Sequence, residues 1–433
     1  MACAFAGPHP AFRRQRRGPA PLRPAALRSR RTPRILQRRS FLAAGHGGAP
    51  FLGGKAGSYG ISEPRRRPPS TQARCLPLLR GAGGMRGSVR PLSGRLRRLR
   101  IGAPLDVGAG GCGAGPGGGE VMSERIDLKV GFRCNNYCQF CVQGDKRERL
   151  PAKAEEELIR SLEEGRAGGA AGVVITGGEP TLHKRIVEIV GKARKLGYTL
   201  IQVQSNGRTF CYEDFCRRLI DAGVNEFGPS LHGSTPKIHD WLTGAPGAFV
   251  QTVSGIRILK RLGQRVITNS VINKANYRDL PALARLFVSL GVDQFQFAFM
   301  HMSGRAGENK EWLTARKSLI EPYVKKALDV GIKAGKTVMT EAIPYCLMSG
   351  YESYVAERII PRTRIYDADC VIPDYTRTRV DEGKVRGPRC VECDWRSSCE
   401  GPWREYPELF GWDEFVPVTK GKSSPKAKVR KAS

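Results

Sequence analysis

The feature that most constrains the fold of this 433-residue chain is a regular alternation of short apolar runs with helix-like segments. We expect strands at 126–132, 172–176, 199–204, 225–231, 265–272 and 293–299. We expect helices between them, at 153–167, 183–196, 212–222, 247–262 and 279–290. Such a rhythm predicts parallel strands with helices outside, in an α/β fold. Six units favour a partial (β/α)6 barrel over a complete eightfold one.

The pattern divides the chain into four parts. Residues 122–305 hold the predicted barrel. Residues 306–416 begin with a predicted long helix (311–334) and continue as a smaller, cysteine-rich domain. Residues 417–433 are a Lys-rich tail that we expect to be disordered.

The first 121 residues have a composition of their own. They hold 23 of the 72 Lys and Arg residues but only three of the 40 acidic residues, and they are rich in Pro and Gly. Such a segment buries too little apolar surface to offset its ordering entropy, so we expect disorder. A transit peptide, a basic tail and a misassigned start upstream of Met122 all fit, and the last is favoured. We therefore infer no function from this leader.

Cysteine usage indicates the kind of chemistry. Ten of the 13 cysteines follow Met122, and six of them gather at 134–141 and 390–399. Tight clusters without a secretory signal favour metal or redox chemistry over a disulfide framework. The sequence has no apolar run long enough to span a membrane. We expect a cytoplasmic protein with neither membrane nor nucleic acid as a partner.

The first cluster, Cys134, Cys138 and Cys141, has the spacing C-x3-C-x2-C. Structural zinc sites use four nitrogen or sulfur ligands, and this loop has no histidine. A disulfide with a spare thiol, a zinc site and chance proximity remain as alternatives to an iron–sulfur cluster. Three thiolates on a [4Fe–4S] cluster would leave one iron open to a small chelating molecule.

This spacing, with an aromatic residue (Phe140) before the last cysteine, resembles the signature of the radical SAM superfamily. The resemblance implies that the amino and carboxylate groups of S-adenosylmethionine (SAM) bind the open iron. It also implies reductive cleavage of SAM to methionine and a 5′-deoxyadenosyl radical. The GGEP segment after the second strand resembles that family's SAM-binding turn, so Gly177, Gly178 and Glu179 are predicted to hold the methionine amino group.

Later strand ends resemble the family more weakly. Ser205 and Asn206 are predicted to contact SAM after the third strand, and Ser230 after the fourth. His232 and Asn273 are further rim residues for which a binding role and a structural role remain open. For Arg305, after the sixth strand, contact with a carboxylate or phosphate and a solvated position in the loop remain open.

The second cluster, Cys390, Cys393 and Cys399, resembles the auxiliary-cluster region of radical SAM proteins with a SPASM or twitch domain. A closed auxiliary [4Fe–4S] site needs a fourth thiolate. We predict Cys346 for this position, with Cys370 as the second choice. Four thiolates suit zinc as well, so that alternative stays open.

The resemblance implies an enzyme that acts on a peptide, a protein or a small molecule. Its cofactors would be SAM, the SAM-binding cluster and one auxiliary cluster, reduced by a donor such as flavodoxin or ferredoxin. The sequence identifies no residue that acts directly on the substrate. The alternatives are a non-catalytic iron–sulfur electron carrier and a zinc-binding protein.

Overall fold

The computed structural model describes residues 124–144, 146–368 and 370–419. The predicted leader (1–121) and residues 420–433 of the predicted tail lie outside this range. No helix in the described part of the chain is long and apolar enough to cross a bilayer.

A nine-stranded sheet organises the described residues, with the strand order β7-β6-β5-β4-β3-β2-β1-β8-β9. Its strands are β1 (Arg125–Lys129), β2 (Gly172–Thr176), β3 (Leu200–Ser205), β4 (Glu226–Pro229), β5 (Arg265–Ile272), β6 (Gln294–Phe299), β7 (Thr337–Glu341), β8 (Thr363–Tyr366) and β9 (Val371–Ile372). Every neighbouring pair is parallel except β8 and β9. The predicted parallel sheet of six βα units is confirmed, and it stays open because β7 and β9 lie at opposite edges.

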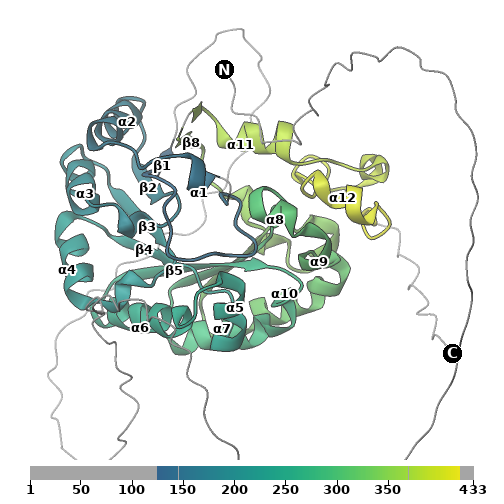
Figure 1. Cartoon of the computed structure of the whole chain (residues 1–433). Helices are drawn as coiled ribbons and strands as arrows, with labels where there is room; N and C mark the ends of the chain where they lie inside the picture. The colour runs from purple at the N-terminus through teal and green to yellow at the C-terminus, as the bar shows by residue number, and fades with distance from the viewer. Residues whose placement is uncertain (1–123, 145, 369, 420–433) are drawn as a thin grey trace, which may run out of the picture. The chain divides into compact units, whose positions relative to one another are not determined.

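The described residues form helices α1 to α12, of which α3, α4, α6 and α7 run along the outer side of the curved sheet (Figure 1). The helices are α1 (Lys146–Arg149), α2 (Glu155–Ala167), α3 (Ile186–Lys195), α4 (Glu213–Ala222), α5 (Pro236–Thr243), α6 (Ala248–Arg261), α7 (Leu280–Ser289), α8 (Gly304–Glu308), α9 (Lys310–Leu313), α10 (Lys317–Lys333), α11 (Tyr375–Thr378) and α12 (Glu405–Phe410). Local sequence sets many of these ends. For example, α5 starts with Pro236 and stops at Gly244, whose φ of 59° is left-handed.

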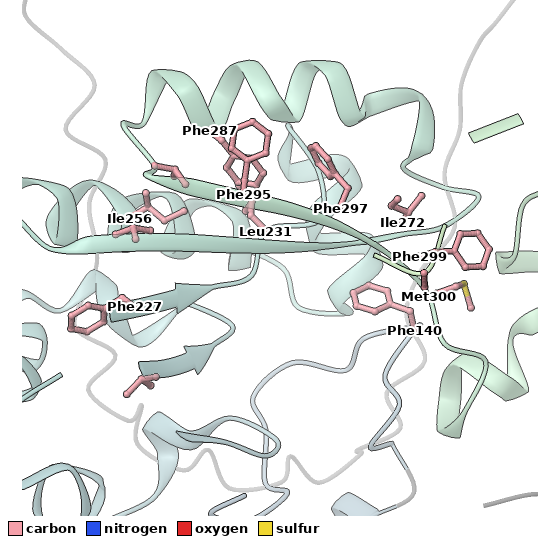
Figure 2. Packing of buried hydrophobic residues seen from close by; sticks show 14 of the residues in the cluster. Phe140, Phe227, Leu231, Ile256, Ile272, Phe287, Phe295, Phe297, Phe299 and Met300 are labelled. Atoms are coloured by element: carbon pink, nitrogen blue, oxygen red, sulfur yellow. The ribbon is translucent and has the colours of Figure 1, made fainter. Parts of the chain in front are cut away.

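Strand β6 shows how the sheet separates its two faces. Its sequence, QFQFAF, alternates half-buried and buried residues. Phe295 and Phe297 pack outward beneath the helices, and Phe295 lies 5.4 Å from the ring of Phe287 on α7 (Figure 2). Gln294 and Gln296 point the other way, into the interior of the sheet's curve. The period of two therefore gives this strand an apolar outer face and a polar inner face.

Three strands from the part after residue 305, β7, β8 and β9, extend the sheet. Strand β7 pairs with β6, with Gln296 opposite Met339, and β8 pairs with β1, with Asp127 opposite Ile365. Strand β7 therefore forms one edge of the sheet, and β8 and β9 lie beyond β1 at the other edge.

The prediction of one continuous helix at 311–334 is wrong, because this segment forms two helices, α9 and α10, with a break between them. A continuous helix would join the carbonyl of Leu313 to the amide of Lys317. Both groups have other partners. Leu313 O accepts from the amide of Lys274 at 2.7 Å, and Lys317 N donates to the hydroxyl of Tyr406 at 2.7 Å. Tertiary contacts thus divide the helix at this point.

Candidate functional site

The cysteine loop (residues 130–144) follows β1 at the carboxyl end of the sheet. Its backbone is held from two sides. The amides of Tyr137 and Gln139 donate to Thr243 O and Leu242 O at the end of α5, at 2.7 and 2.9 Å. The guanidinium of Arg147 on α1 donates to the carbonyls of Cys134 and Asn136. The loop is therefore held in place through its backbone.

Cys134, Cys138 and Cys141 all line one cavity of about 550 Å³. Burial raises the pKa of Cys138, and the neighbouring thiols of Cys141 and Cys134 raise it further. Burial also raises the pKa of Cys134, although the amide of Asn136 donates to its sulfur at 3.4 Å. These thiols therefore resist ionisation together unless a cationic group lies between them.

The GGEP turn lies directly against the cysteine loop. The amide of Gly178 donates to Gly131 O at 2.8 Å, and the amide of Glu179 donates to Arg133 O at 2.9 Å. Gly177 has a φ of 131°, and a Cβ atom there would lie 2.2 Å from Gly131 O. A Cβ atom on Gly178 would lie 2.3 Å from Phe132 O. Only glycine permits this approach, and both glycines line the cavity.

The carboxylate of Glu179 is 2% exposed and sits in a network of donors. It accepts from the hydroxyl of Ser205 at 2.8 Å, from the amide of Asn206 at 2.6 Å and from the amide of Thr181 at 3.1 Å. Burial raises its pKa, and these hydrogen bonds oppose the rise. Glu179 therefore ties the end of β3 to the turn after β2, while Ser205 and Asn206 line the cavity beside the two glycines.

The remaining predicted rim residues separate into two groups. Ser230 lines the cavity, and its amide donates to Ser205 O at 2.9 Å. His232 also lines it, but its Nδ1 accepts from the amide of Val271 at 3.1 Å, and burial lowers its pKa well below the usual value. Asn273 is fully buried, and its Oδ1 accepts from the amide of Ala275 at 2.9 Å. His232 and Asn273 therefore each accept a hydrogen bond from a backbone amide of the protein.

Arg305 lines this cavity together with Arg147 and Arg149. Its amide donates to Cys141 O at 2.9 Å, and its guanidinium carbon lies 3.4 Å from the ring centroid of Tyr137. Its Nη1 is buried and has no hydrogen-bond partner among the described residues. A buried guanidinium nitrogen in this state is a ready donor for a carboxylate.

Residues 128–287 match the family model described as the radical SAM superfamily. This segment is a radical SAM domain. The matched segment runs from β1 to α7. It includes every residue named above as lining the cavity except Arg305.

Relatives and solved structures agree with this family. A protein named probable GTP 3′,8-cyclase from Saccharolobus solfataricus is 29% identical over 183 residues, which cover 42% of this chain and 58% of that protein. An AdoMet-dependent heme synthase from Methanosarcina barkeri is 27% identical over 180 residues, covering 41% of this chain and 51% of that protein. This chain thus spans less than two thirds of each relative.

The solved structure of SuiB from Streptococcus suis bound to its precursor peptide SuiA has a TM-score of 0.51 at 15% identity. The alignment covers 65% of this chain and 72% of SuiB. At this level of identity the likeness concerns the fold alone.

The residues of the radical SAM cavity fit the cofactors that the family implies. Three thiols, a backbone amide directed at one sulfur and an unpartnered guanidinium nitrogen share one cavity. Its volume lies in the usual range for a small-molecule site. Cys134, Cys138 and Cys141 would hold the cluster, and the walls beside them would receive SAM.

A second group of thiols gathers in the part that follows β7. Cys346, Cys390, Cys393 and Cys399 line one small pocket. Burial raises the pKa of Cys346 to about 12, and Cys399, Cys393 and Cys390 contribute to the rise. Cys370, the second choice for the fourth ligand, lines a different and larger cavity. The described residues contain no group of three or more Cys, His, Asp or Glu side chains placed to hold a metal ion.

The larger cavity, of about 1070 Å³, fills the concave side of the sheet. Four residues line both this cavity and the radical SAM cavity: Gln143, Arg149, Gln204 and Ser230. The inward side chains on its walls are mostly polar: Arg125, Asp127, Lys129, Gln202, Gln204, Asn269, Gln294, Gln296 and Glu341. These residues were not predicted from the sequence. The alternating Gln residues of β3 and β6 nevertheless indicate that each strand has one polar face.

His301 also lines this cavity, and it was not predicted from the sequence. Its ring stacks on Trp403 with centroids 4.0 Å apart, and its Nε2 lies 3.4 Å from a carboxylate oxygen of Glu405. Burial raises the pKa of Glu405, but the hydrogen bond and charge of His301, a backbone hydrogen bond and the charge of Arg404 together outweigh burial and lower that pKa. The C-terminal part thereby orients a side chain of the cavity.

Proposed function

We propose that this chain is an enzyme that cleaves SAM reductively and uses the resulting radical to remove a hydrogen atom from a polar substrate. The observation that carries the proposal is the shared boundary of two cavities. The cavity that contains the three thiols and the large polar cavity share Gln143, Arg149, Gln204 and Ser230 in their walls. A substrate in the second would therefore lie next to SAM in the first.

The chain's own groups have defined tasks in this proposal. When bound, the cluster and SAM supply the electron and the 5′-deoxyadenosyl radical. The thiols of Cys134, Cys138 and Cys141 hold the cluster. The backbone at Gly177 and Gly178 faces the methionine amino group, and Nη1 of Arg305 donates to the methionine carboxylate.

Glu179 acts through its neighbours in this scheme. Its carboxylate holds Ser205 and Asn206 in place, and these two residues and Ser230 bind the nucleoside part of SAM. The surrounding walls exclude water from the reactive radical.

We propose an auxiliary [4Fe–4S] cluster at Cys346, Cys390, Cys393 and Cys399, because these four thiols line one pocket. With four protein ligands such a cluster would be closed to substrate, which favours a role in electron transfer.

Two substrate classes have support. SuiB, which has a similar fold, was solved with a precursor peptide, and a relative is named as a cyclase of GTP. The carboxamides of Gln202, Gln204 and Gln296 offer both donors and acceptors, which suit peptide groups and heterocycles alike.

The test is the formation of 5′-deoxyadenosine from SAM by anaerobically reconstituted full-length protein with dithionite. We expect product with the wild type and none with Cys134→Ala. A wild type that contains a reducible cluster but forms no 5′-deoxyadenosine would indicate an electron carrier instead. Zinc without iron or sulfide would indicate the zinc-binding alternative.

A further inference from the structure

A chain of hydrogen bonds runs in one direction along the floor of the large cavity. Arg265 donates to one oxygen of the Glu226 carboxylate at 2.6 Å, and Nε2 of Gln202 donates to the other at 2.8 Å. Because a carboxylate only accepts, Gln202 presents its nitrogen to Glu226 and its oxygen to the next side chain. That oxygen accepts from Nε2 of Gln204 at 3.2 Å. The chain therefore ends at the carboxamide oxygen of Gln204, a residue that lines both cavities.

Strands β6 and β7 also leave acceptors on the wall of this cavity. Nε2 of Gln296 donates to the carboxylate of Glu341, the last residue of β7, and both residues line the cavity. The carboxamide oxygen of Gln296 is thus the end of the group that remains for a ligand. The carboxamide oxygen of Gln143 is buried and accepts no hydrogen bond from the described residues. We call Gln143, Gln204, Gln296 and Glu341 the acceptor group.

Glu341 forms no ion pair with any residue in the described part of the chain. Two cations act on its charge from a distance, but each is bonded to another carboxylate. Lys384 pairs with Glu357 at 3.5 Å, and Arg379 makes two bonds to Glu400, at 2.8 and 2.6 Å. Burial raises the pKa of Glu341 and the charge of Glu357 raises it further, while Lys384 and Arg379 oppose the rise. A carboxyl group in this setting gains most from an added cation.

The cations of the large cavity lie on another part of its wall. They belong to β1 and α1: Arg125, Lys129, Lys146 and Arg149. Two of them pair with carboxylates that line the same cavity, Lys129 with Asp127 at 3.2 Å and Lys146 with Asp367 at 2.9 Å. In the sheet, four strands separate β1 from β6. Repulsion from the β1 side and attraction to Glu341 would both direct a positively charged ligand toward β6 and β7.

We propose that the large cavity binds a positively charged group of the substrate that carries several N–H donors, a primary ammonium or a guanidinium, with Glu341 as its counter-ion. The inference rests on the proposed function, because it takes this cavity as the substrate site. Both groups carry donors and no acceptor, so they complement the oxygens of the acceptor group. Met339 precedes Glu341 by two residues and also lines the cavity, so its thioether would contact the aliphatic stem of such a group.

The experiment compares three blocked amino acids as probes. Nα-acetyl-arginine amide carries a guanidinium, Nα-acetyl-lysine amide carries an ammonium, and Nα-acetyl-citrulline amide is a neutral match to arginine in size and shape. The protein is the full-length chain, reconstituted anaerobically and saturated with SAM but given no reductant, so that no radical forms. Saturation-transfer NMR measures each dissociation constant. We expect the better cationic probe to bind at least about tenfold more tightly than the citrulline probe.

The variant Glu341→Gln keeps the size of the side chain and removes its charge. It should weaken binding of the better cationic probe by about tenfold and leave the affinity for the citrulline probe unchanged. The unchanged citrulline affinity also shows that the cavity is intact. The matched control is Glu188→Gln on α3, which makes the same change of charge at a side chain that is 44% exposed and should alter neither affinity.

The outcomes separate this inference from the proposed function. Citrulline binding as tight as that of both cations would overturn the cation site. So would an unchanged affinity in Glu341→Gln, an equal loss for the citrulline probe, or an equal loss in Glu188→Gln. If the cation preference and its loss in Glu341→Gln are found, but the wild type forms no 5′-deoxyadenosine with dithionite, the cation site stands and the proposed function is contradicted.

Discussion

The two cysteine sites differ in how the chain brings their thiols together. Cys134, Cys138 and Cys141 lie in one loop, and the cavity around them is built from the ends of neighbouring strands. The second pocket joins Cys346, which follows β7, to the segment that contains Cys390, Cys393 and Cys399. The first site is thus local in sequence and the second depends on long-range packing. We expect the first to tolerate damage to the C-terminal part better than the second.

Different interactions hold the two sites. Backbone hydrogen bonds from α5 and the GGEP turn fix the first loop. Side chains hold the second: the buried guanidinium of Arg379 makes two bonds to the carboxylate of Glu400, at 2.8 and 2.6 Å. Tyr345 also stacks on Trp395 with centroids 4.7 Å apart.

The largest effect should come from removing one thiol of either site. We expect Cys134→Ala and Cys390→Ala each to lose about one cluster, or roughly four irons. Cys134→Ala should abolish formation of 5′-deoxyadenosine, whereas Cys390→Ala should retain it. Iron and sulfide analysis with product assays checks this, with the fully buried Cys216→Ala as the control. Loss of both clusters from either change would contradict two independent sites.

Substitution of a crowded glycine near each site should affect that site alone. A Cβ atom on Gly178 would lie 2.3 Å from Phe132 O, and one on Gly401 would lie 2.0 Å from Val385 O. Gly178→Ala should weaken SAM binding by at least about tenfold, since a shift of about 1.4 kcal/mol suffices. Gly401→Ala should lose auxiliary iron and keep SAM binding. Calorimetry and iron analysis measure both effects.

The control for this pair is Gly191→Ala in α3, where an added Cβ atom has no neighbour within 4 Å. It should raise stability by about 0.5–1 kcal/mol, because alanine favours a helix over glycine. If Gly401→Ala impaired SAM binding as strongly as Gly178→Ala, the two sites would be structurally coupled.

A smaller loss is expected from the ion pair behind the second pocket. Arg379→Met would leave the carboxylate of Glu400 buried without its partner and should lower the free energy of unfolding by about 3–5 kcal/mol. Arg185→Met breaks a pair on the surface of the barrel, where Arg185 is 54% exposed, and should cost less than about 1 kcal/mol. Urea denaturation compares them, and equal losses would contradict the reliance of the second site on buried side chains.

The last effect depends on pH and concerns the junction of the two parts. Lys317 is fully buried, donates to Ala342 O at 2.8 Å and lies over the rings of Phe299 and Tyr406. Burial lowers its pKa well below the usual value. Below about pH 10 the unfolded chain therefore binds this proton more readily than the folded protein, and stability falls as pH falls toward the folded pKa.

Lys317→Met should remove this dependence. The wild type should lose about 1.4 kcal/mol per pH unit relative to the variant as the pH is lowered from about 10. Urea denaturation at several pH values measures the difference, and Lys325→Met, at a partly exposed pair with Glu321, is the control. A difference that does not change with pH would show that Lys317 stays charged in the folded protein.

The sequence alone determined the features that depend on neighbouring residues. The period of two along QFQFAF and the helical period between strands predicted the parallel sheet, because each strand buries its own alternate side chains. The spacing of Cys134, Cys138 and Cys141 and the two glycines of GGEP predicted a SAM site. The structure places these residues, with Ser205, Asn206 and Ser230, on one cavity, since parallel strands end at the same edge.

Tertiary structure decided what depends on distant partners. It directed the carboxylate of Glu179 to Ser205 and Asn206, left a guanidinium nitrogen of Arg305 buried in the cavity, and broke the predicted helix where Lys274 and Tyr406 take its backbone bonds. It also placed Cys346 with the second cluster and Cys370 on the large cavity. No local pattern contains this information, because a side chain's partner is selected by the packing of segments that are far apart along the chain.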